Sequence, residues 1–444
     1  MSFRTLLRCC VAGAAVFLAA CAGPSRNYRA NLENLIAAGN YAGAQADIER
    51  NKRSEYSRKN AVLYYLDLGM VQHDASLYRD SSDNFSAAER RMEDLFTKSL
   101  HRAAGTFLLN DNTAEYAGEV FERALTNAFR ALDYVFLGSP DDALVEARKV
   151  TAYLGRYNDY MQGRSGYKDD AFAQYLSGML FEQNGDADDA RICYDAARAA
   201  YAWYGPYYGT PEPEFDVPAY ADLAGKGLGE VVVLHYNGKA PLKVSRTFQV
   251  AWNDAMIAVD QSRDEEEDAG RFRNALKAGV LGSAITVAYP VYERPPFKIA
   301  SSRVEAASAT ATTQLMDDVS AIAVKALEER NAAVRTRAIA RAAIKFVLAR
   351  AAAEEVKKKA GDGLGLLAGI VTNITAAATE TADTRGWTTV PAQVRMARLA
   401  LPPGRHDVTL YFYGAAGEPE GSHTFTDVEV TRGRRTYLHY RTAE

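Results

Sequence analysis

The pattern of apolar and polar residues divides the chain into a helical first half and a second half richer in strands. From residue 28 to about residue 200 the chain reads as one helix after another, with the apolar spacing of helices that bury one face. Proline, which interrupts helices, occurs in that stretch only as Pro140. We therefore predict a helical domain over residues 28–200.

Two stretches of this half share one spacing of small and aromatic residues. Gly69 is followed by Phe85 at +16, and Gly178 is followed by Tyr194 at the same distance, each with small residues at +12 and +19. Small residues let two antiparallel helices approach closely, and the aromatic ring fills the gap between them. This is the tetratricopeptide pattern.

The copies of this pattern are unevenly spaced. The small residues that anchor two clear and two weaker copies are Ala44, Ser81, Ala143 and Ala190. They lie 37, 62 and 47 residues apart, whereas a regular array has a period of about 34. We predict an irregular tetratricopeptide-like α-solenoid with insertions; a generic helical bundle is the alternative.

Beyond residue 200 short apolar runs and turn residues replace the helical pattern. Residues 200–215 hold three prolines and are predicted to be a linker. Residues 314–359 are predicted to be helical. The expected strands are residues 230–236, 243–252 and 283–292. Together these segments predict a mixed α/β central domain over residues 201–390.

The end of the chain reads as strands joined by short turns. The expected strands are residues 394–401, 407–413, 424–431 and 436–440. They predict a small C-terminal antiparallel β module over residues 391–444. The fold class is accordingly α+β: the solenoid, the mixed region and the β module.

Composition narrows the class of protein without naming a chemistry. The chain has 444 residues, of which 48% are hydrophobic and 24% charged, so it can bury a core and is not wholly disordered. Its formal net charge is -4, which argues against nucleic acid as the main partner. Only 4 cysteines exclude a disulfide scaffold.

The N-terminus carries a bacterial lipoprotein signal. Arg4 and Arg8 precede a short apolar run that ends in Leu-Ala-Ala-Cys at residues 18–21. We predict a signal peptide over residues 1–20, lipidation of Cys21 and a short tether over residues 21–27. Ala22 after the cysteine favours the outer membrane, so we expect a lipid-anchored protein that faces the periplasm. A plain secretory signal is the alternative.

A search for catalytic motifs finds none. The chain lacks H-E-x-x-H, C-x-x-C and G-x-S-x-G. We therefore predict no catalytic residue, no metal site and no cofactor. His406, His423 and His439 all lie in the C-terminal strands, so their convergence on a metal is the alternative.

Two sets of residues are candidates for binding. The concave face of a solenoid usually binds peptides or proteins, and Tyr153 and Tyr157 are aromatic candidates there, with inter-helix packing as the alternative. Arg337, Arg341 and Lys345 recur every four residues and share one helix face. This basic stripe could contact an anionic polymer or phospholipid, or it could be a solvated face.

The chain resembles a family of largely uncharacterised bacterial lipoproteins with a tetratricopeptide-like front half. The resemblance rests on residues 175–182 with Gly185 and Asp186, on 229–238, on 337–341 with Lys345, and on 401–404. Some members are encoded near lipoprotein activators of peptidoglycan synthases. The resemblance implies a role in the cell envelope and supplies no catalytic residue.

We accordingly expect a non-enzymatic scaffold or regulator of cell-envelope assembly, with peptidoglycan assembly as the candidate process. Its expected partners are envelope proteins, bound through the solenoid, and the membrane, through the lipid anchor. The alternative is a periplasmic glycan-acting enzyme whose acidic residues line a cleft in the central domain. A deep pocket with converging ionisable groups would favour the enzyme. Whether the glycine-rich residues 361–374 touch the membrane stays open.

Overall fold

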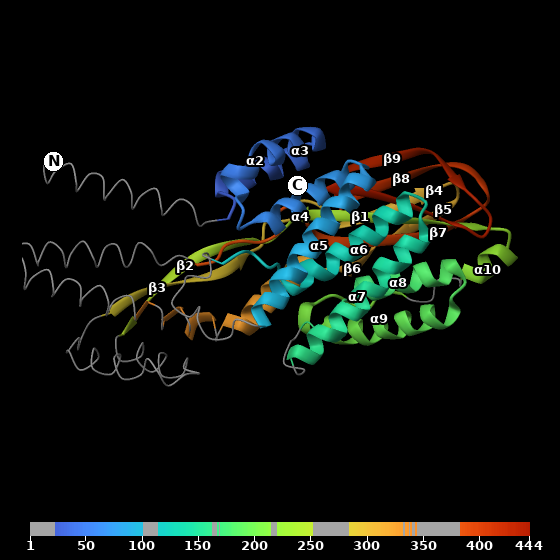
Figure 1. Ribbon diagram of the computed structural model, residues 1–444. Helices are drawn as coiled ribbons and strands as arrows, with labels where there is room; N and C mark the ends of the chain where they lie inside the picture. The colour runs from blue at the N-terminus through green and yellow to red at the C-terminus, as the bar shows by residue number, and fades with distance from the viewer. Residues whose placement is uncertain are drawn as a thin grey trace, which may run out of the picture.

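A computed structural model describes the chain at residues 23–100, 114–161, 167, 169–214, 220–251, 284–331, 334–336, 338–339, 342–343 and 382–444. Helices dominate the N-terminal half and sheets the C-terminal half (Figure 1), which confirms the predicted α+β class. The predicted signal peptide, Cys21 and residues 361–374 lie outside the described residues. No helix among the described residues is long and apolar enough to cross a membrane.

Eight consecutive helices and a short π-helix build the first half. Their bounds are α2 Arg26–Ala37, α3 Tyr41–Arg50, η1 Lys52–Tyr56, α4 Ala61–Asp74, α5 Tyr78–Leu100, α6 Val120–Phe136, α7 Pro140–Met161, α8 Ala171–Asn184 and α9 Ala187–Tyr208. A short α10 follows at Tyr220–Gly225, and a further helix covers residues 319–331.

Four helical hairpins, α2–α3, α4–α5, α6–α7 and α8–α9, close with the same turn. In each, a residue with positive φ follows the first helix, and the next N–H donates to the carbonyl five residues earlier. These bonds join 40 to 35, 77 to 72, 139 to 134 and 186 to 181. The four predicted anchors, Ala44, Ser81, Ala143 and Ala190, occupy equivalent buried positions in the second helices.

The predicted close contacts within two hairpins are present. A Cβ atom at Gly69 would lie 2.9 Å from the ring of Phe85, and one at Gly178 would lie 2.7 Å from the ring of Tyr194. Any side chain larger than hydrogen would therefore displace the aromatic ring. The shared spacing thus reports a real contact between antiparallel helices.

The strands form two four-stranded sheets and one ribbon. Their bounds are β1 Gly229–Lys239, β2 Leu242–Ala251, β3 Ala284–Glu293, β4 Ser301–Ala306, β5 Ala309–Thr312, β6 Gln314–Asp317, β7 Pro391–Leu401, β8 Gly404–Tyr413, β9 Pro419–Val430 and β10 Arg435–Thr442. The inner sheet has the order β10-β1-β7-β6, the outer sheet β5-β4-β8-β9, and β2 pairs with β3.

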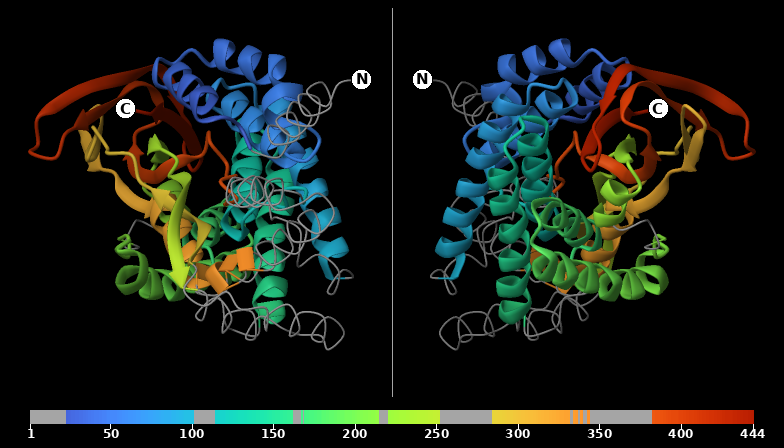
Figure 2. Two further views of the ribbon diagram at one scale, coloured as in Figure 1. Left: turned by 90° about the vertical axis from the view of Figure 1, so that its left-hand side faces the viewer. Right: turned by 90° about the vertical axis from the view of Figure 1, so that its right-hand side faces the viewer.

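The inner sheet lies between the helices and the outer sheet. Val232, Leu234 and Tyr236 of β1 join the core shared with the helices, and Val231 and Val233 join the core shared with the outer sheet. Because β1 is buried on both faces, its sequence is apolar without alternation. Figure 2 shows the helices curving around one side of the strands.

The C-terminal strands do not form a sheet of their own, unlike the predicted antiparallel module. β7 and β10 flank β1 in the inner sheet, and β10 runs parallel to it, whereas β8 and β9 belong to the outer sheet. The reason is non-local: β1 has two edges and two apolar faces to cover, and its partners come from the far end of the chain.

Two other segments differ from the sequence prediction. Helix α9 continues to Tyr208 through the predicted linker, because Tyr201, Tyr204 and Tyr208 are spaced three and four residues apart and are buried on one face. Residues 314–317 form β6 rather than helix, because they pair with β7. The helix begins only at residue 319.

Candidate functional site

The inner face of the helical array is covered by the protein's own inner sheet. Helices α4, α6 and α8 are the first helices of their hairpins, and all three contact strands. His73 and Phe129 contact Tyr236 of β1, and Tyr175 accepts a hydrogen bond from Arg398 of β7. This face, which the sequence predicts as the concave binding surface, is therefore not open to a partner.

A buried polar network lies where α4, α5 and α6 meet the inner sheet. His73 Nδ1 lies 2.7 Å from Asp133 Oδ1, and His73 Nε2 lies 3.1 Å from the hydroxyl of Tyr236. Ser81 donates to Asp133 at 2.7 Å. Burial lowers the pKa of His73 to about 3, so its imidazole is neutral at pH 7, and burial raises the pKa of Asp133 well above its usual range.

This network is not a catalytic triad. Ser81 hydrogen-bonds to the carboxyl group and not to the imidazole, so the serine–histidine contact of a triad is missing. His73, Ser81 and Asp133 are each 0% exposed, which leaves no room for a substrate. The network satisfies polar groups of the core.

A second buried cluster joins helix α6 to β2 and to the helix over residues 319–331. Glu119 accepts from Lys243 at 2.9 Å and from Arg330 at 2.6 Å. Burial alone would raise the pKa of Glu119, but these two cations lower it to about 2. Glu122, one turn on, accepts from the backbone N–H of Trp387 at 2.8 Å. Both carboxylates are thus fully engaged in holding elements together.

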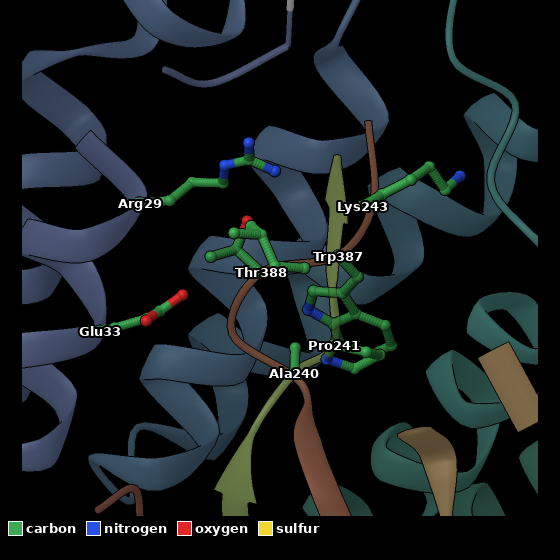
Figure 3. Close-up of a pocket in the computed structure, with 9 residues that line it drawn as sticks. Arg29, Glu33, Ala240, Pro241, Lys243, Trp387 and Thr388 are labelled. Carbon is green, nitrogen blue, oxygen red and sulfur yellow. The ribbon is translucent and has the colours of Figure 1, made fainter. Parts of the chain in front are cut away.

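A small opening beside this cluster is too narrow for a ligand. Arg29 and Glu33 reach from α2 toward Trp387 and Thr388, and Lys243 lies across from them (Figure 3). The cavity has a volume of about 10 Å³, which is room for a single water molecule at most.

A larger cavity of about 420 Å³ lies where α8 meets the edges of both sheets. Its lining includes Tyr175 of α8, Glu214, residues 310–312 of β5, and Met396 and Arg398 of β7. Its two charged groups have opposite sign. Arg398 is bound at 2.6 Å to Glu230, a buried carboxylate outside the lining. The cavity is of ligand size, and its chemistry is mixed polar and apolar.

The cavity lies beside an unpaired stretch of strand edge. β1 pairs with β7 from Pro391 to Leu401, but on the opposite side β6 pairs only with residues 394–396. Among the described strands none pairs with residues 397–401 on that side. Thr310 and Thr312 of the short edge strand β5 are exposed at the rim. Unpaired strand edges accept an added strand from another polypeptide.

Of the predicted site residues, the structure describes only Tyr153 and Tyr157. Arg337, Arg341 and Lys345, like Cys21, lie outside the described residues. Tyr153 of α7 is 8% exposed, with the guanidinium of Arg123 4.4 Å above its ring. Its ring centroid lies 6.3 Å from that of the half-buried Tyr157. Tyr153 therefore packs between helices, which was the alternative to ligand contact.

The three C-terminal histidines occupy three different places. His406 bonds to the carbonyl of Pro402, His423 stacks on Tyr440, and His439 lies at the helix–sheet interface, 4.7 Å from the ring of His73. Within the part of the chain that the structure describes, no group of three or more His, Cys, Asp or Glu side chains could hold a metal ion.

Sequence reasoning missed the 420 Å³ cavity because its walls come from four separate stretches between residues 175 and 398. The fold and the cavity define an α+β protein in which helical hairpins pack against two sheets, with the cavity beside a partly unpaired edge of β7. Comparison of the chain with known protein families, with curated proteins and with solved structures finds no match.

Proposed function

We propose that this protein is a triacylated outer-membrane lipoprotein that faces the periplasm and acts as a non-enzymatic scaffold in cell-envelope assembly. Its four helical hairpins form an irregular tetratricopeptide-like solenoid whose inner face holds its own sheet. The resemblance noted in the sequence points to peptidoglycan synthesis as the process.

The observation that carries the scaffold role is the cavity at the open edge of β7. An extended segment of an envelope protein would pair with residues 397–401 and place alternate side chains in the cavity, as in strand addition. A segment bound there would also contact the helical array, since Tyr175 of α8 lines the cavity.

The chemistry of the lining favours binding over hydrolysis of glycan. A glycosidase needs two carboxyl groups facing one another across the substrate. Among the described lining residues Glu214 is the only carboxylate, and its backbone N–H donates to Gln314 at the cavity wall. The glycan-acting enzyme therefore lacks a supporting arrangement here.

Site-specific crosslinking tests the binding site. A photoreactive residue in place of Thr312, in the cavity, should crosslink in intact envelopes to an extended segment of one protein, identified by mass spectrometry of the joined peptides. The matched control replaces Thr424, which is likewise exposed and lies on the edge strand β9. Crosslinks from Thr424 alone, or release of glycan fragments by the purified protein, would contradict the proposal.

The anchor is tested separately. Cys21→Ser should abolish labelling with a palmitate analogue and release the protein from membrane fractions, because the acyl chains supply the membrane affinity. Unchanged labelling and fractionation would contradict the lipoprotein assignment.

A further inference from the structure

A dense basic segment lies next to the point where the described chain begins. Residues 50–59 contain five basic residues and one acidic residue, in a chain whose net charge is -4. Arg50, Lys52, Arg53 and Arg58 are exposed. We call residues 50–59 the basic segment.

The basic segment is anchored in the core through Tyr56. It contains the π-helix η1. The next residue, Ser57, has a φ of 54°, a backbone conformation that residues other than glycine rarely adopt. Tyr56 is 0% exposed and donates to Asp67 at 2.9 Å. Because Tyr56 is fixed in the core, the cations around it are held at the surface.

The start of the chain is bound to the basic segment. Glu55, the single acidic residue of the segment, accepts from the backbone N–H of Ser25 at 2.7 Å and from its hydroxyl at 3.1 Å. The carboxylate is therefore engaged by Ser25. Cys21 precedes Ser25 by four residues, which span at most about 14 Å when fully extended. A lipid on Cys21 thus brings the basic segment to the bilayer surface.

We propose that the basic segment is a membrane-contact surface that binds anionic phospholipid headgroups and thereby orients the anchored protein relative to the bilayer. The proposal rests on acylation of Cys21, which is part of the proposed function. Charge complementarity and the short reach of the tether select this partner. Each Lys or Arg near an anionic bilayer strengthens binding roughly fivefold, and salt weakens it.

Vesicle binding by the mature chain without its acyl groups tests this surface. The protein begins at residue 21, carries Cys21→Ser, and is sedimented with vesicles of phosphatidylcholine or of phosphatidylcholine and phosphatidylglycerol in equal parts. It should bind the anionic vesicles only. The triple variant Lys52→Glu, Arg53→Glu, Arg58→Glu should bind on the order of a hundredfold more weakly.

The matched control reverses three exposed arginines elsewhere in the helical array: Arg148→Glu, Arg191→Glu and Arg198→Glu, on α7 and α9 (Figure 1). It changes the net charge equally and should keep most of the binding. A second triple variant changes Lys52, Arg53 and Arg58 to glutamine. If it binds the anionic vesicles more weakly and keeps its melting temperature, the loss of binding is not caused by unfolding.

Equal losses in both glutamate triples would assign the binding to net charge and overturn the proposal, as would equal binding to neutral and anionic vesicles. The acyl chain is absent from this assay, so its outcome is distinguishable from failure of the anchor. Palmitate labelling in cells reports on the anchor alone.

Discussion

The inner sheet packs against helices on one face and against the outer sheet on the other, and the two interfaces use different side chains. Toward the helices, Glu230 binds Arg435 at 2.5 Å and Arg398 at 2.6 Å, and Arg435 donates to the carbonyl of Met179 in α8. Toward the outer sheet the core is mainly apolar and includes Leu399 and Leu410, with the bond between His235 and Ser302 as a polar contact.

We infer from this difference that the two interfaces of the inner sheet have different roles in folding. Apolar packing stabilises in proportion to buried area and tolerates several arrangements. Each buried polar group has partners in one geometry only, and an unmatched one destabilises the fold. We expect the polar interface to select which helix meets which strand, and the apolar interface to supply stability with less selectivity.

The largest effect should come from breaking the buried charge cluster. Glu230→Gln leaves Arg398 and Arg435 without their shared counter-charge, so we expect a loss of about 3–5 kcal/mol in the free energy of unfolding. Urea denaturation measures it. A loss under about 1 kcal/mol would mean that the cluster behaves like an exposed pair and that the interface is not desolvated.

Two buried groups, one on each side of the inner sheet, should respond oppositely to acid. His235 lies toward the outer sheet, bonded to Ser302 and Thr442, and burial lowers its pKa to about 3. The unfolded chain takes up this proton near pH 6.5 and the folded chain does not, so stability falls as pH falls. His235→Gln should remove about 2 kcal/mol of the change between pH 7 and 5.

Asp67, on the helical side of the inner sheet, should change stability with pH in the opposite direction. Burial raises its pKa to about 7, so the folded chain takes up the proton first and stability rises as pH falls from 7 toward 4. Asp67→Asn should make the protein more acid-sensitive, by about 2 kcal/mol between pH 7 and 5. Denaturant unfolding at the two pH values checks both variants, and a shift of the same sign in both would contradict the assignment.

Two glycines of the helical layer, one at a close contact within a hairpin and one with open space around it, allow a further comparison. Gly178→Ala forces a methyl group against the ring of Tyr194, for an expected loss of about 1–3 kcal/mol. Gly155→Ala, in helix α7 with no atom within 4 Å of the new methyl group, should gain about 0.5–1 kcal/mol. Thermal melting distinguishes them, and a shift of equal sign would show that Gly178 is not at a close contact.

The smallest effect belongs to an exposed ion pair with the geometry of the buried one. Arg405 and Asp427 also lie 2.6 Å apart, but their side chains are 59% and 67% exposed. Arg405→Gln should cost less than about 1 kcal/mol, because water already solvates both partners. A loss as large as that of Glu230→Gln would show that burial is not what separates the two pairs.

Local features of the sequence determined the helical hairpins. Gly39, Gly138 and Gly185 supply the left-handed residue of three turns, and small residues mark where paired helices touch. The apolar run of β1 likewise predicted a buried strand. These signals act over a few residues or within one hairpin, so the sequence displays them directly.

Strand pairing and the cavity were decided by the tertiary structure alone. The sequence located β1, β7 and β10 as strands but did not show that they pair, because β1 lies more than 150 residues before β7. Residues 314–317 read as helix and pair as β6 because β7 offers an edge there. The cavity includes residues 397 and 398 of β7, which lie beyond the stretch that β6 pairs with. Such contacts depend on which surfaces remain uncovered after the layers assemble, and no local pattern records that.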